Sequence, residues 1–306
     1  MSVALSFGIR TSLYALSDID GQAAVSNKRL ATGKKVNDAI DNPLNFFLAR
    51  GFDKNKSDLS NLLDSQNVAL ATLNKTIKSI ESITKLVEQV QGLARQALQS
   101  SDDSATGVRF TLGTQIQSTL NQITELTRDG GFNGKNLVGR TPDTLRIDFN
   151  SETGVNLTKL DVTGTDLRLN GALLNFGIAA QGFTTPAVAA PGIETTTFNG
   201  IGATGFANDA AGNARIQALI DNSVSAVNKL QSTASSFAVN LSVLQIRVDF
   251  SKSQQRTLAT ASDAITLADI NEEGATLASL QTRQQIAVQA LSLANRSDQA
   301  VLRLFG

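Results

Sequence analysis

Apolar residues recur at alternating steps of four and three near both ends of the chain. Near the N-terminus this spacing selects eight positions, six of them apolar: Leu5, Ile9, Ser12, Leu16, Ile19, Ala23, Ser26 and Leu30. Near the C-terminus it selects nine positions, seven of them apolar: Leu277, Leu280, Gln284, Ala287, Leu291, Ala294, Asp298, Val301 and Phe305. Such heptad-like seams are typical of helices that pack lengthwise against another helix. The pattern therefore predicts a long helix at each end of the chain.

Two stronger seams lie inside these ends. The first occupies Leu59, Leu62, Gln66, Ala69, Leu73, Thr76, Ile80, Ile83, Val87, Val90, Ala94 and Ala97. The second runs from Ile216 to Ile265 with the same spacing, and no proline interrupts either seam. Each seam thus predicts one long helix of the coiled-coil type. A third, shorter helix is predicted over residues 104–128.

The length of the second inner helix indicates the shape of the molecule. A helix from Ala214 to Ala268 would be roughly 80 Å long at about 1.5 Å per residue. A compact globule of this chain length would be only roughly 50 Å across. We therefore expect a rod of long antiparallel coiled-coil helices.

Helix-breaking residues mark where these helices end. Gly33 is expected to end the first helix, and Asn42 with Pro43 has the form of an N-cap and a first helical residue. A tight turn is expected at Asn133 and Gly134.

The middle of the chain has a different pattern. Apolar residues alternate at Leu145, Ile147 and Phe149 and again at Val155 and Leu157, which predicts a small β-hairpin. Residues 171–214 are rich in Gly, Ala and Thr and read as loop. The predicted fold class is mainly α with a small β/loop-rich insertion.

Composition narrows the possible functions. The chain has 27 basic and 27 acidic residues, so no net charge attracts nucleic acid or an anionic membrane. Arg10 and polar residues interrupt the apolar positions of the N-terminal stretch, so we expect neither a secretory signal nor a membrane span there. Histidine and cysteine are absent, which excludes sites and triads built from them. The paired acids Asp102/Asp103 and Glu272/Glu273 are interpreted as solvated acids and helix N-terminal residues. We expect no cofactor, no metal and no catalysis.

Several motifs, in order, resemble bacterial flagellin. The stretch "RLATGKKVNDAIDNP" (Arg29–Pro43) is similar to a conserved element of that family, and "FNGKNL" (Phe132–Leu137) to the signature that ends its N-terminal region. The C-terminal stretch from "ASDAITLADINEEG" to "LANRSDQAVLRLFG" is similar to the family's other end. The resemblance covers residues 1–139 and 216–306, whereas 140–215 match nothing recognisable.

The resemblance implies a subunit that polymerises into the flagellar filament for motility. It implies export of the unfolded chain through the flagellum's own type III apparatus, without a cleaved signal, to an extracellular filament. The implied partners are further copies of the chain, other flagellins, an export chaperone, and the hook-junction and cap proteins.

The resemblance also implies a division of the chain. The innermost core helices would be 1–33 and 274–306, the spoke 34–52, the rod 53–139 and 216–273, and the variable outward segment 140–215. Within the spoke and turn, the expected positions are Gly33, Asn37, Asp41, Asn42 and Pro43. The terminal helices would pair as a coiled coil in the filament core. The residues expected to drive polymerisation there are Leu5, Ile9, Leu16, Ile19, Ala23, Leu30, Leu277, Leu280, Ala287, Leu291, Ala294, Val301 and Phe305.

An innate-immune receptor contacts some members of this family on the helix that corresponds to Val87–Ser100. Leu93 and Gln96 match the recognised pattern. Gln91 and Gly92 replace an arginine and a glutamate, and Gln115 replaces another glutamate. We therefore expect weak or absent recognition by that receptor.

Two alternatives stay open at this point. A hook–filament junction protein shares the terminal regions, although the intact "RLATGKKVNDAIDNP" and "FNGKNL" elements favour a filament subunit. A flagellin-like surface protein could instead bind polysaccharide through residues 150–214, which contain phenylalanine but no tryptophan or tyrosine for sugar stacking.

Overall fold

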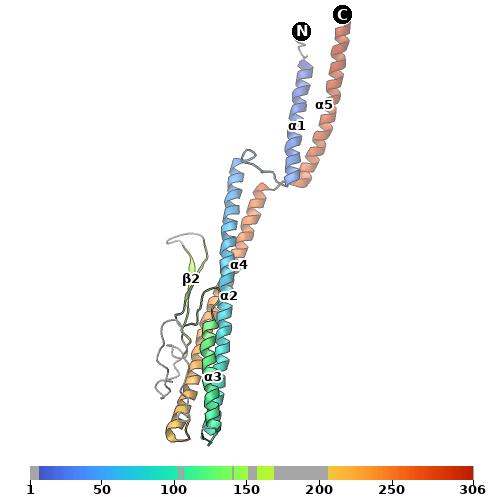
Figure 1. The fold of residues 1–306 in the computed structure, drawn as a ribbon. Coiled ribbons are helices and arrows are strands. Elements are labelled where there is room, and N and C mark those ends of the chain that lie inside the picture. The colour runs from blue at the N-terminus through green and yellow to red at the C-terminus, as the bar shows by residue number, and fades with distance from the viewer. Residues whose placement is uncertain are drawn as a thin grey trace. The chain divides into compact units, whose positions relative to one another are not determined.

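The structure, a computed structural model, describes residues 7–102, 104, 107–139, 141–150, 157–168 and 206–305. The elements in chain order are α1 (Phe7–Thr32), α2 (Pro43–Gln99), α3 (Val108–Asp129), β1 (Thr144–Asp148), β2 (Lys159–Thr163), α4 (Ala210–Thr266) and α5 (Ile270–Phe305) (Figure 1). The predicted fold class, mainly helical with a small β insertion, is confirmed.

The chain forms two compact units. Unit 1 comprises Met1–Asp58 and Gln254–Gly306, and unit 2 comprises Leu59–Ser253. The long helices α2 and α4 each contribute residues to both units. Each unit is described below by itself.

The core of unit 2 is one hydrophobic cluster supplied mainly by α2, α3 and α4, with further residues from β1 and β2. The seam predicted for α2 faces this cluster, since Leu73, Ile83 and Val87 are fully buried. Leu244 of α4 and Ile116 of α3 are equally buried. Burying each such side chain contributes about 1.5–3 kcal/mol, so the seam residues contribute strongly to the stability of unit 2.

A two-stranded antiparallel sheet lies beside these helices, and its register corrects one prediction. Asp148 of β1 pairs with Lys159 of β2, so β2 contains Leu160 and Val162. The second strand was expected at Val155 and Leu157. The Phe149 amide donates to the Thr158 carbonyl oxygen at 2.8 Å, which places Leu157 beyond the last pair. Val155 lies outside the described residues.

Two contacts fix the hairpin to the helices of unit 2. The Gln66 side chain of α2 is fully buried and donates from Nε2 to the Asp148 carbonyl oxygen at 3.2 Å. The Arg247 guanidinium of α4 lies 5.1 Å from the centre of the Phe149 ring, within the range of a cation–π contact. A buried polar side chain on the seam therefore has a specific partner.

The predicted tight turn after α3 is confirmed. Asn133 and Gly134 both have positive φ angles, 49° and 75°, as a hairpin turn with two left-handed residues requires. Phe132 and Lys135 pair across the turn through two backbone hydrogen bonds of 2.8 and 2.9 Å.

In unit 1, α1 and α5 lie side by side and run in opposite directions (Figure 1). No helix in the described part of the chain is both long and apolar enough to cross a membrane.

Candidate functional site

The α1–α5 pair packs through the residues that the heptad pattern predicts. On α1, Ile9 and Ser26 are buried, while the remaining described seam residues are half-buried: Ser12, Leu16, Ile19, Ala23 and Leu30. On α5, Leu280 is buried, and the half-buried set is Leu277, Ala287, Leu291 and Ala294. Leu5 lies outside the described residues, and Val301 and Phe305 belong to α5 although their side chains are not described. Two helices alone therefore bury this seam only in part.

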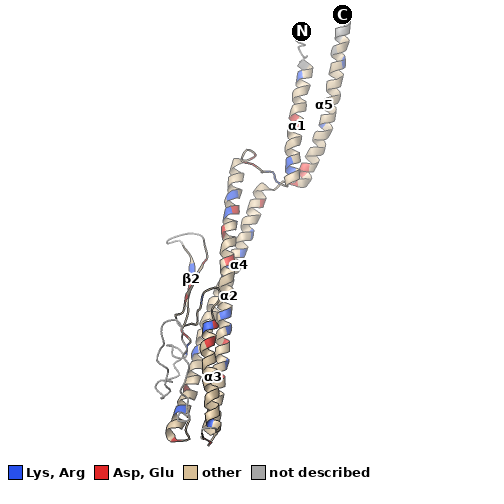
Figure 2. Ribbon diagram, viewed as in Figure 1, with Lys and Arg blue, Asp and Glu red and all other residues tan. Residues whose placement is uncertain are grey.

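Other faces of the same helices expose large apolar side chains. Tyr14 is 73% exposed and Leu293 is 70% exposed. Leu13, Ile286 and Val288 are exposed as well. Figure 2 shows few charged residues along the two helices between their ends. Apolar surface of this extent marks a site of association.

A short backbone pairing connects the two helices at one end of unit 1. Gly33 follows α1 with φ +69°, a left-handed conformation that glycine adopts without strain. The Lys35 amide donates to the Thr266 carbonyl oxygen at 2.8 Å, and the Ala268 amide donates to the Gly33 carbonyl oxygen at 3.0 Å. The end of α1 and the α4–α5 junction are thereby held together by main-chain hydrogen bonds.

The turn that follows is organised by a carboxylate. Asp41 accepts hydrogen bonds from the backbone amides of Asn37 at 2.9 Å and Asp38 at 3.0 Å. The bond from Asn37, then that from Asp38, and the charge of Lys28 hold the pKa of Asp41 below its ordinary value. Asp41 therefore stabilises the turn as the charged carboxylate.

The start of α2 has the predicted cap. The Asn45 amide donates to the Asn42 side-chain oxygen at 3.0 Å, and the helix begins at Pro43. Asn42 is thus the N-cap and Pro43 the first helical residue, which confirms that prediction.

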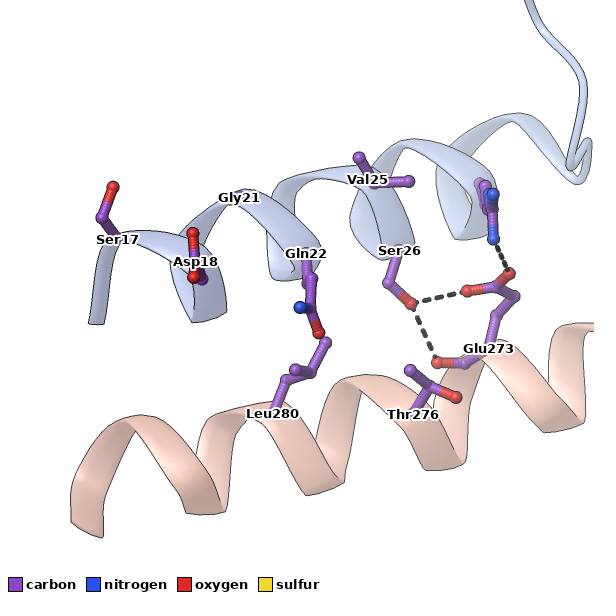
Figure 3. A pocket seen from close by; sticks show the side chains of 10 residues that line it. Ser17, Asp18, Gly21, Gln22, Val25, Ser26, Glu273, Thr276 and Leu280 are labelled. Atoms are coloured by element: carbon purple, nitrogen blue, oxygen red, sulfur yellow. Dashed lines mark hydrogen bonds and ion pairs between the residues drawn. The ribbon is translucent and has the colours of Figure 1, made fainter. Parts of the chain in front are cut away.

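Glu273 in the first turn of α5 connects the two helices of unit 1. Its Oε2 accepts from the Ser26 hydroxyl at 2.7 Å, and its Oε1 lies 2.8 Å from Arg29 Nη1 (Figure 3). The Glu273 side chain is 13% exposed. The hydrogen bonds from Ser26 and then Arg29 lower the pKa of Glu273. Glu273 therefore lies in the first turn of its helix, as expected, but the expectation that it is a solvated acid is wrong, because Ser26 and Arg29 of α1 bond to it.

We expect Glu273→Gln to loosen this junction. At neutral pH the variant lacks the charge-assisted bonds, so exchange of the Lys35 and Ala268 amides should be roughly tenfold faster. Because the folded-state pKa is lowered, this stabilisation is present above the ordinary carboxyl pKa and disappears as the pH falls through the folded value. The two proteins should thus converge in acid when hydrogen–deuterium exchange is corrected for intrinsic rates. The neighbouring exposed Glu272→Gln is the matched control, and equal effects of both variants would contradict this role.

A groove of about 530 Å³ opens beside the Glu273 contacts. Asp18, Gly21 and Val25 of α1 and Thr276 and Leu280 of α5 are among the residues that line it (Figure 3). The described residues contain no group of three or more acidic side chains arranged to hold a metal ion. Most side chains that line the groove are polar or charged, and Val25 and Leu280 are its large apolar members. A mixed polar and apolar surface of this kind is typical of a contact with another protein.

The receptor-related positions lie on unit 2. Gly92 and Gln96 are exposed on α2, and Gln115 is exposed on α3. Gln91 is half-buried, and Leu93 packs against the core cluster.

Sequence reasoning missed Glu273 and the groove. The pair Ser26–Glu273 joins residues 247 positions apart, so no local spacing reveals it. One signal was present, because Ser26 is a polar residue on the α1 seam and is nevertheless buried. A buried hydroxyl requires a partner.

Comparison with known proteins gives matches at both ends of the chain. The pattern of the bacterial flagellin N-terminal helical region matches residues 15–141, and that of the C-terminal helical region matches residues 218–305. Together these regions include α2, α3, most of α1 and nearly all of α4 and α5.

Curated relatives match over almost the whole chain. Flagellin FljM of Caulobacter vibrioides is 28% identical, with 99% of this chain and 98% of the relative covered. Flagellin FljO of the same organism is 28% identical over 96% of each chain, and flagellin FljK is 26% identical over 99% of this chain and 98% of the relative. With both terminal regions matched and relatives of equal extent, the chain belongs to the bacterial flagellin family, whose members are structural subunits of the flagellar filament.

Proposed function

We propose that this flagellin polymerises through the α1–α5 pair. In this proposal the half-buried seam holds the two helices together, while the other faces contact the same helices of neighbouring copies. The supporting observation is that the α1–α5 pair leaves Tyr14, Leu293 and other large apolar side chains exposed. Each such side chain would gain about 1.5–3 kcal/mol on full burial.

The division of labour along the chain follows from this proposal. Segments 1–33 and 274–306 form the filament core, and 34–52 is the spoke. Segments 53–139 and 216–273 form the surrounding rod, and 140–215 faces outward. The action is mechanical, so no residue acts as a catalyst and no cofactor takes part.

Export precedes assembly in the proposed route. An export chaperone binds the chain inside the cell, and the chain then leaves unfolded through the flagellar type III apparatus. Outside, it joins a filament between the hook-junction and cap proteins. The absence of cysteine supports this route, since no thiol can oxidise on the way. Other flagellins can co-assemble where their terminal helices present the same faces.

The two alternatives are not favoured. The curated relatives are flagellins along the full chain, which argues against a hook–filament junction protein. Nothing among the described residues of the 150–214 segment adds support for polysaccharide binding.

Polymerisation of Leu293→Asp tests the proposal. We expect purified chain seeded with filament fragments to form long filaments in negative-stain electron micrographs, and the variant to raise the critical concentration at least tenfold. The reason is that a carboxylate would replace a side chain buried between copies. Gln289→Asp, which adds the same charge at an exposed polar position of α5, is the matched control. Normal filaments from Leu293→Asp would contradict the proposed interface, and failure of the unmodified chain to polymerise would contradict the function.

A further inference from the structure

The turn before α2 and its first helical turns expose an unusual set of apolar side chains. Ile40 is 95% exposed, and Leu44, Phe47 and Leu48 follow it within nine residues, all exposed. We call these four residues the Ile40 patch. Since monomeric proteins seldom expose so many large apolar groups together, the patch marks a contact surface.

The patch is preorganised for binding. The rings of Phe46 and Phe47 lie 5.5 Å apart in an edge-to-face arrangement. The Arg50 guanidinium lies 5.6 Å from the centre of the Phe46 ring. Aromatic and arginine side chains held in this way are the usual anchors of a protein interface, because little freedom is lost on binding.

The α1–α5 groove supplies a matching surface on the same unit. Its volume of about 530 Å³ is sufficient for several side chains, and Val25 is exposed within it. A side chain added at Gly21 would meet no atom within 4 Å, so the groove is open above that residue. Among the charged lining residues, Arg29 and Glu273 pair with each other, which leaves Asp18 with a charge opposite to that of Arg50.

We propose that in the filament the Ile40 patch of one copy inserts into the α1–α5 groove of a second copy. The inference rests on the proposed function and names a contact between copies in addition to that of the exposed helix faces. Patch and groove are different surfaces of one unit, so the contact is heterologous. Each added copy leaves one free patch and one free groove, and such a contact propagates as an open helical polymer instead of closing as a dimer.

Mixed disulfide formation tests this pairing. The chain has no cysteine, so Ile40→Cys and Val25→Cys can be made as separate single-cysteine proteins. A disulfide requires the two Cβ atoms to approach to about 3.5–4.5 Å. We expect filaments grown from an equal mixture to give crosslinked dimers under mild oxidation, and filaments of either variant alone to give few. A mixture of Val25→Cys with Ile246→Cys, an exposed isoleucine of unit 2, is the control.

A second measurement fills the groove without disturbing the helix. Gly21→Leu places a large side chain in open space and raises helix propensity, so α1 should fold at least as well. We expect filament elongation from seeds to slow at least tenfold, whereas Gly92→Leu, at an equally open glycine of α2, should elongate normally.

The outcomes separate this inference from the proposed function. Filaments that form from the mixture without the Ile40–Val25 crosslink, or that elongate normally with Gly21→Leu, would overturn the inferred contact alone. Crosslinking of Ile40→Cys with itself would also overturn it, because the patch would then meet its own copy. A chain that forms no filaments in unmodified form would contradict the proposed function instead.

Discussion

A chain that lacks its last ten residues, 297–306, should form no filaments while unit 2 stays folded. The two terminal helices differ in length, since α5 has 36 residues and α1 has 26. Both are measured from the same junction, where Lys34 pairs with Leu267. At about 1.5 Å per residue, α5 therefore extends roughly 15 Å beyond the described part of α1.

This difference in length makes the truncation informative. The remaining helix from Ile270 still spans the described length of α1, so Glu273 and Leu280 keep their contacts within the chain. Loss of polymerisation would then report lost contacts between copies, because the internal pairing is unchanged. The buried cluster of unit 2 lies between Leu63 and Val248 and contains no residue from the deleted segment.

Seeded growth followed by light scattering and electron microscopy measures the result. Circular dichroism and the melting transition of the truncated chain should match those of the full chain in unit 2. A full-length protein with the last ten residues in scrambled order is the control. It keeps the length and composition of the chain and removes only the seam pattern of the tail. Growth of the truncated chain at the normal critical concentration would show that the tail makes no essential contact.

The heptad spacing predicted most of the packing correctly, and its one clear exception is instructive. Every described position of the α1 seam is buried or half-buried, because a period near 3.5 places these residues on one helix face. On α5, however, Gln284 is exposed and donates from Nε2 to Asp20 at 2.8 Å. A long polar side chain at a seam position can turn to the edge of a helix pair and bond there.

No periodic pattern in the sequence predicted the contacts between segments that lie far apart along the chain. The Arg29–Glu273 ion pair depends on how far α1 runs before Gly33 stops it. The second strand was misplaced because its register is set by hydrogen bonds around Asn150 and Thr158, not by the apolar alternation of its own residues. The Ile40 patch was likewise missed, since exposure is a property of the folded unit.

Arg109 is the clearest case of a residue that only the structure reveals. It lies near the start of α3 and is 1% exposed, which makes it a charged side chain fully buried in unit 2. Its Nη1 donates to the Ser100 carbonyl oxygen at 3.1 Å and to Asn208 Oδ1 at 3.0 Å, and its Nη2 donates to Asn213 Oδ1 at 2.7 Å. One guanidinium thus joins the end of α2, the start of α3 and the start of α4.

Replacing this side chain should be the most damaging single change in unit 2. Arg109→Ala would leave three acceptors without their charged donor and open a void where the side chain was. Hydrogen bonds to charged groups contribute about 1.5–3 kcal/mol each but not additively, and the void adds to the loss. We expect a cost of about 3–5 kcal/mol, equivalent to a fall of roughly 10 °C in the melting temperature for a unit of this size.

The fork geometry of the guanidinium, and not its charge alone, should determine the size of this effect. Arg109→Lys keeps the charge, but one ammonium cannot reach the Asn208 and Asn213 oxygens and the Ser100 carbonyl with the same alignment, so we expect about half the loss. Arg128→Ala is the matched control, because Arg128 is an exposed arginine of the same helix paired with Glu125. Such a surface pair contributes only about 0–1 kcal/mol. Thermal unfolding followed by circular dichroism, with amide exchange in α3 and α4, measures all three variants. If Arg109→Ala unfolded like Arg128→Ala, the three-way contact would not contribute to stability, and the hydrophobic cluster alone would set the register of α4 against α2 and α3.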